Sequence, residues 1–141
     1  MTEPITLEPR NIRELWDDIK PCLEELKAKW PNQGTWRVED VYAAVIAEQA
    51  VLYAVDEGFA ICTLDTDKYS GKTDLYIWIA YAYEDSRGGI LKKYLPSFIE
   101  VAKSLGCSGV TTASSHPALA QMEEFEVMYT RYRVEVNATA R

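Results

Sequence analysis

The chain has 141 residues, enough to bury one hydrophobic core, and its 48% hydrophobic and 26% charged residues exclude an intrinsically disordered chain. The 15 Lys and Arg against 22 Asp and Glu give a net charge of −7, which repels phosphate backbones and argues against nucleic-acid binding. Cys22, Cys62 and Cys107 are far apart and form no CxxC pair, so neither a zinc site nor a disulfide framework is predicted.

No stretch of the sequence approaches the roughly 18 apolar residues that a membrane span requires. The N-terminus also lacks the basic segment and apolar run of a signal peptide. We therefore expect one domain over residues 1–141, no membrane association and, with unpaired thiols, a cytoplasmic location.

The first third of the chain predicts a short strand at Thr6 and Leu7, followed by two helices. Asn11 and Glu14 form a capping-box pattern at the start of the first helix, which Pro21 is expected to kink or restart. Its apolar residues are spaced by three or four positions: Ile12, Leu15, Trp16, Ile19, Leu23, Leu26 and Trp30. Turn residues separate it from a second helix with an apolar face made of Val38, Val41, Tyr42, Val45 and Ile46.

From residue 50 the hydrophobic pattern changes to the period of a strand. Residues 51–55 and 59–64 predict a hairpin around the turn Asp56-Glu57-Gly58. Residues 74–83 are apolar and aromatic at successive positions, which predicts a central strand covered on both faces.

The last third predicts a helix over residues 90–105, closed by Gly106, and then a strand over 108–113. A short helix over 117–123 and an extended strand over 125–136 follow. This order places a right-handed crossover inside an otherwise antiparallel sheet, and the expected fold class is mixed α/β.

The turn between the central strand and the long helix is the most informative part of the sequence. Arg87, Gly88 and Gly89 precede the helix, whose first backbone N–H groups have no partner inside the helix. Such groups suit an anionic diphosphate, and Arg87, Lys92 and Lys93 add positive charge. The same two glycines would also serve an ordinary tight turn.

The run YAYEDSRGGILKK over residues 81–93, with FIEVAKSLGC over 98–107, resembles the coenzyme-A motif of the GNAT N-acyltransferase superfamily. The resemblance implies a mostly antiparallel central sheet with helices on both faces and a splayed central strand pair. It further implies acetyl-CoA as cosubstrate and direct transfer of its acetyl group to an amine. The backbone of Ile79, Ala80 and Tyr81 would pair with pantetheine, and the amides from Arg87 to Ile90 would hold the diphosphate.

The chain departs from the family where the family's usual general acid, a tyrosine, is expected, because Ala120 or Gln121 stands there. Four residues are candidates for the proton transfers instead: Tyr129, Tyr132, His116 and Glu84. Each has a structural alternative, since the tyrosines could pack on a strand, the histidine could cap a turn, and the glutamate could be a solvated charge.

In the family that the chain resembles, the loop between the first two helices helps to form the acceptor pocket. Trp30 and Trp36 flank this loop. They could bind the substrate or anchor the loop to the core. The acceptor is expected to be a small-molecule or peptide amine, and the acidic composition favours a cationic one, such as a polyamine, an aminoglycoside or a lysine.

A second hypothesis is a catalytically inactive GNAT-fold protein with a binding or structural role. The short length and the segment WRVEDVY over residues 36–42 resemble small acyltransferase-like proteins of tailed phages, some of which resemble virion components. That resemblance implies a host-cytoplasm or virion location and assembly into a homo-oligomer or a virion.

Overall fold

The computed structural model describes residues 6–29, 35–83, 89–113 and 124–128, and the single positions 132, 134 and 136. In these parts of the chain five strands form one sheet in the order β1-β2-β3-β4-β5. Neighbouring strands are antiparallel except for the parallel pair β4–β5, which α3 connects. The elements are β1 (Pro9–Arg10), α1 (Ile12–Lys29), α2 (Val38–Ile46), β2 (Val51–Val55), β3 (Gly58–Thr66), β4 (Thr73–Ala82), α3 (Gly89–Ser104) and β5 (Gly109–Thr112).

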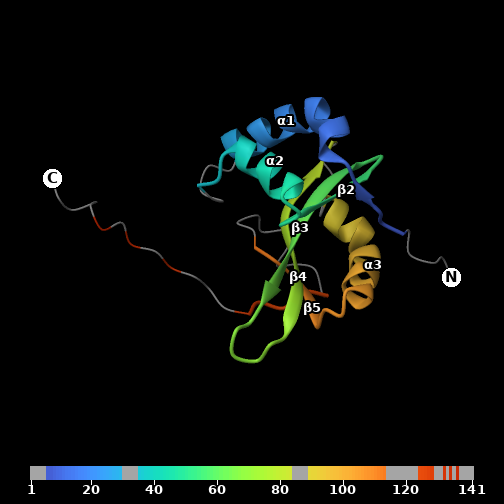
Figure 1. Ribbon diagram of the computed structural model, residues 1–141, viewed down its shortest axis with the longest axis vertical. Helices are drawn as coiled ribbons and strands as arrows, with labels where there is room; N and C mark the ends of the chain where they lie inside the picture. Colours follow the sequence, from blue (N-terminus) through green and yellow to red (C-terminus); the bar gives the residue numbers. More distant parts are fainter. Residues whose placement is uncertain are drawn as a thin grey trace.

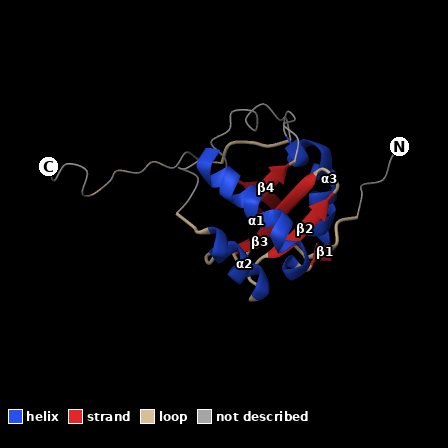
Figure 2. Ribbon diagram, turned by 90° about the horizontal axis from the view of Figure 1, so that it is seen from above, coloured by secondary structure: helices blue, strands red, loops and turns tan. Residues whose placement is uncertain are grey.

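Helices cover both faces of the sheet: α1 and α2 lie on one face and α3 on the other (Figures 1 and 2). Each face has its own buried cluster, because successive residues of a strand point to opposite sides. The α3 face holds Leu7, Tyr53, Ala60, Cys62, Leu75, Ile77, Ile90, Tyr94, Phe98 and Ala102. The α1–α2 face holds Ile12, Ile19, Leu23, Val38, Val41, Ala50, Leu52, Phe59, Ile61 and Ile79. The predicted mixed, mostly antiparallel sheet with helices on both faces is confirmed.

A β-bulge interrupts the pairing of β3 with β4. Ile61 pairs with Ile79 but the next residue of β3, Cys62, pairs with Ile77, so Trp78 is an extra residue on β4. For this reason Ile77 packs on the α3 face, whereas Trp78 and Ile79 both pack on the α1–α2 face. A bulge of this kind bends its strand and increases the local twist.

The beginning of the chain differs from the prediction in two places. The first strand is Pro9–Arg10 rather than Thr6 and Leu7, and Leu7 is a buried residue outside any strand. Helix α1 runs through Pro21 as one element, so the predicted restart does not occur. Asn11 caps its N-terminus, since Asn11 Oδ1 accepts a hydrogen bond of 3.0 Å from the Arg13 N–H, which is the N-cap half of the predicted capping box.

The end of α3 confirms the predicted left-handed cap at Gly106, whose φ is +74°. The Gly106 N–H donates to the Lys103 carbonyl (3.1 Å), and the Cys107 N–H donates to the Ala102 carbonyl (2.8 Å). These two bonds form a Schellman motif, which positions the chain for β5.

The predicted terminal strand over residues 125–136 is wrong where the structure describes it, because residues 124–128 lie outside the sheet. The apolar side chains that suggested a strand remain exposed: Val127, Met128, Val134 and Val136. Since none of them is covered, burial provides no driving force for strand pairing. The predicted helix over 117–123 lies outside the described residues.

Candidate functional site

The candidate site is the corner between the end of β4 and the start of α3, called the corner below. Strand β4 ends at Ala82 and α3 begins at Gly89, which has a φ of +54°. A side chain is strained at such a φ, so the corner needs glycine at this position. A Cβ placed on Gly89 would lie 3.7 Å from Ala82 Cβ, so the helix starts against the end of the strand.

Beside the corner, the pairing of β5 with β4 comes to an end. Their parallel pairing covers four residue pairs and ends at Ile77 with Thr112, where Thr112 Oγ1 donates to the Ile77 carbonyl (3.0 Å). Strand β4 continues from Trp78 to Ala82, and among the described residues this stretch has a ladder with β3 only. The bulge at Trp78 directly follows the last β4–β5 pair. The splayed strand pair stays a prediction, because the residues that follow β5 from position 114 lie outside the described residues.

The residues expected to bind pantetheine are on this stretch of β4. Ile79 is buried, and Ala80 and Tyr81 are partly buried on opposite faces of the sheet. Their backbone lies beyond the last β4–β5 pair of the described residues, and their binding to pantetheine stays a prediction.

Glu57, in the turn between β2 and β3, contacts both sides of the corner. Its carboxylate accepts hydrogen bonds from Lys93 Nζ and from the Tyr94 hydroxyl (2.7 Å), both on α3. Its backbone carbonyl accepts one from the Tyr83 N–H (2.8 Å), directly after β4. The bonds from Lys93 and Tyr94 hold the pKa of Glu57 below its usual value. Sequence reasoning missed Glu57 because a charged residue in a hairpin turn looks like an ordinary solvated side chain.

On the α1 side of β4, the Tyr81 hydroxyl donates to Glu25 Oε2 at 2.5 Å. This hydrogen bond, with burial and the negative charge of Glu25, raises the pKa of Tyr81 well above its usual range. The Tyr81 hydroxyl is thus the donor in this contact and the Glu25 carboxylate the acceptor. Its ring stacks on Phe59, with the ring centroids 5.5 Å apart. Glu25 was not a sequence candidate, because it is 56 residues away from Tyr81 on an exposed position of α1.

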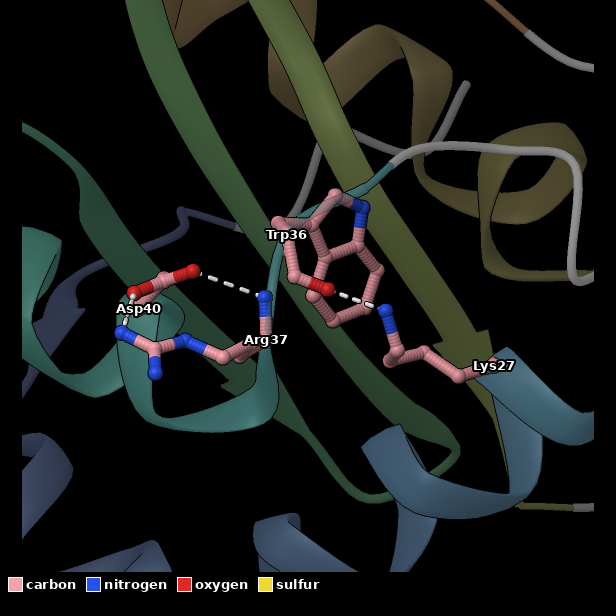
Figure 3. Close-up of polar contacts among 4 residues, drawn as sticks. All are labelled: Lys27, Trp36, Arg37 and Asp40. Atoms are coloured by element: carbon pink, nitrogen blue, oxygen red, sulfur yellow. Dashed lines mark hydrogen bonds and ion pairs between the residues drawn. The ribbon is translucent and has the colours of Figure 1, made fainter.

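Trp36 is half-buried and anchors the segment before α2 (Figure 3). Its ring meets Trp78 edge to face, with centroids 5.9 Å apart, and Lys27 Nζ lies 4.5 Å from the Trp36 ring centroid. Lys27 also donates to the Trp36 carbonyl, and the Asp40 carboxylate accepts a 2.7 Å bond from the Arg37 N–H at the start of α2. These contacts favour the alternative in which Trp36 anchors the loop to the core, because its ring lies against Trp78, the bulged residue of β4.

The other predicted site residues are distributed as follows. Ile90 is buried at the start of α3, whereas Lys92 is exposed on its first turn. Tyr132 is 88% exposed, which does not favour a place for it in a cleft. Six more lie outside the described residues: Trp30, Glu84, Arg87, Gly88, His116 and Tyr129.

A cavity of about 170 Å³ lies between α1 and the end of β2, bordered by Arg10, Asp18, Asp56 and Tyr83. Within the described parts of the chain, neither α3 nor β5 contributes to the lining of this cavity, so it is separate from the point where the β4–β5 pairing ends. No group of three or more metal-ligating side chains occurs among the described residues. None of the described helices combines the length and the apolar character that crossing a bilayer would need.

No family model matches the sequence, and no curated protein matches it. Solved structures do share its fold. A probable acetyltransferase has a TM-score of 0.69 at 14% identity, over 94% of this chain and 99% of its own. A putative acetyl transferase from Pyrococcus furiosus has a TM-score of 0.68 at 17% identity, over 92% and 99%.

A third similar structure is the ribosomal-protein-alanine N-acetyltransferase from Brucella melitensis biovar Abortus 2308. Its TM-score is 0.63 at 17% identity, over 93% of this chain and 99% of its own. Identities this low show a shared fold alone. The five-stranded mixed sheet with three described helices is thus similar in fold to these acetyltransferase structures.

Proposed function

We propose that this GNAT-fold chain is an N-acetyltransferase that transfers the acetyl group of acetyl-CoA to an amine. The observation that carries the proposal is the end of β4–β5 pairing at Ile77, while β4 continues to Ala82 beside the corner. Pantetheine carries amide groups, so it can add to the edge of β4 from Trp78 to Ala82 as an extra strand would.

The corner supports the diphosphate end of the same ligand. The first turn of α3 has backbone N–H groups without helical partners, and the helix dipole places partial positive charge there. Gly89 at φ +54° keeps side-chain bulk away from this turn, and Lys92 is exposed beside it. Arg87 and Gly88 remain predicted members of this set.

In the reaction, the nitrogen of a neutral amine attacks the thioester carbonyl carbon, so that a C–N bond forms and the C–S bond breaks. The amine proton goes to a base, and the departing thiolate takes up a proton. Tyr129, Tyr132, His116 and Glu84 remain the predicted candidates for these proton steps. The acceptor is expected to be cationic, because the chain carries a net charge of −7.

The test is thermal unfolding with and without acetyl-CoA. At about 100 times its Kd the ligand adds about 2.7 kcal/mol to the free energy of unfolding, which raises the Tm by several degrees in a domain of this size. Gly89→Asp should abolish the shift and Gly89→Asn should retain part of it. Asp and Asn tolerate a positive φ similarly, so the pair isolates the negative charge beside the diphosphate.

A wild-type protein without a thermal shift at millimolar acetyl-CoA would overturn the enzyme proposal and leave the non-catalytic binding or structural role, including that of a virion component. If the shift occurs, release of the coenzyme A thiol should be measured over a panel of polyamines, aminoglycosides and lysine peptides. Thiol release that depends on one of these amines would identify the acceptor class.

A further inference from the structure

We propose that Glu57 is a positioning residue for acetyl-CoA: it fixes the N-terminal part of α3 relative to the end of β4. The inference rests on the proposed function, since these are the two elements that would hold the diphosphate and pantetheine. Glu57 lies in neither element and acts through Lys93 and Tyr94 of α3 and through Tyr83, the residue directly after β4.

The bond to Tyr94 is the part of this contact that constrains α3. The Tyr94 side chain is buried in the cluster beneath α3, with 5% of its surface exposed. Its hydroxyl is part-buried and donates to Glu57 Oε1 at 2.7 Å, and a hydrogen bond to a charged acceptor is stronger than one between neutral groups. The ion pair of Glu57 with Lys93 is largely exposed and contributes less.

The backbone of Glu57 is held against the end of β4. The Glu57 carbonyl accepts from the Tyr83 N–H, and the next residue, Gly58, pairs with Ala82. A Cβ on Gly58 would lie only 2.0 Å from the Tyr81 carbonyl oxygen, so the turn lies directly against the strand. The carboxylate of Glu57 therefore reaches α3 from a backbone that the end of β4 holds in place.

Substitution of Glu57 gives a decisive test, because loss of its charge and loss of its contacts would change the Kd of acetyl-CoA in opposite directions. A carboxylate close to a diphosphate repels it, so removing the charge alone would tighten acetyl-CoA binding. Loss of positioning would weaken binding instead, because the N–H groups of α3 would no longer be held at the ligand. Tyr94→Phe breaks the same contact without a change of charge.

The experiment measures the Kd of acetyl-CoA by isothermal titration for the full chain, Glu57→Ala, Tyr94→Phe and the control Glu100→Ala. Glu100 pairs with Lys103 near the other end of α3, so the control removes an exposed carboxylate that, like Glu57, pairs with a lysine of this helix. Each titration is made at a temperature where circular dichroism shows the variant to be fully folded, so that a merely stabilising role would not change the Kd.

We expect about tenfold weaker binding for Glu57→Ala, which removes the acceptor of Tyr94 together with the charge, several-fold weaker binding for Tyr94→Phe, and an unchanged Kd for the control. Tighter or unchanged binding by Glu57→Ala would overturn the positioning role, as would a wild-type Kd for Tyr94→Phe. A wild-type chain that does not bind acetyl-CoA at all would overturn the proposed function, so the two failures are distinguishable. If Glu57→Ala does not fold, Tyr94→Phe alone decides.

Discussion

Gly58 is the position at which a single methyl group should disturb both the sheet and the corner. An alanine Cβ there would lie 2.0 Å from the Tyr81 carbonyl oxygen and 3.0 Å from Ala82 Cα. Both are backbone atoms of β4, so neither can rotate away. Restoring an ordinary contact of 3.4 Å to the oxygen requires β3 and β4 to move apart by about 1.4 Å.

The free energy of unfolding should fall by about 3 kcal/mol, at the upper end of the usual cost of overpacking. This corresponds to a loss of roughly 10 °C in Tm for a domain of this size. The φ of Gly58 is outside the left-handed range, so backbone strain adds nothing and the close contact alone is responsible.

Urea unfolding followed by circular dichroism measures the effect of Gly58→Ala, with Gly109→Ala as the matched control. At Gly109 the nearest atom to an added Cβ is a carboxylate oxygen of Asp74, 3.3 Å away on a side chain that can rotate. The free energy of unfolding of the control should therefore fall by less than about 1 kcal/mol. If it falls no more for Gly58→Ala than for the control, the argument that β3 and β4 are too close at Gly58 to admit a methyl group is refuted.

Three further predictions concern the end of α3, Glu57 and a buried thiol. Gly106→Ala should lower the free energy of unfolding by about 1–2 kcal/mol in urea, because its φ is +74°; a loss below about 0.3 kcal/mol would contradict the cap. The pKa of Glu57 lies below its ordinary value of 4.5 in the folded chain, so its stabilisation is complete above that pH and is lost as the pH falls below it. The difference in urea midpoint between wild type and Glu57→Gln should thus be present at pH 7 and vanish in acid, well below pH 4.5. A difference in midpoint that persists in acid would show that the ionised carboxylate of Glu57 is not its cause. Burial raises the pKa of Cys62 to about 12, so iodoacetamide at pH 8 should label it only after unfolding; mass spectrometry showing native labelling as fast as at Cys22 would disprove the burial.

The elements of the fold depend mainly on local chemistry, which is why the sequence predicts most of them. The spacing of apolar residues in α1, α2 and α3, and the short apolar runs of β2 and β3 beside turn residues, are patterns that each extend over only a few neighbouring residues. Gly106 and the glycine at the start of α3 were likewise identifiable, since a positive φ at a helix end or a tight corner is a requirement of the local backbone. The prediction failed for the described part of residues 125–136, where Val127, Met128, Val134 and Val136 remain exposed.

Only the tertiary structure decided the details of the candidate site. The bulge at Trp78 is a property of the β3–β4 register, so it depends on a partner strand whose alignment no local pattern specifies. The contacts of Glu57 with Lys93 and of Tyr81 with Glu25 join residues 36 and 56 positions apart. A charged residue in a turn or on a helix surface has the same local signature whether or not it reaches such a partner. The sequence alone therefore determines the elements and the glycine corner, whereas packing across the sheet decides which side chains hold that corner together.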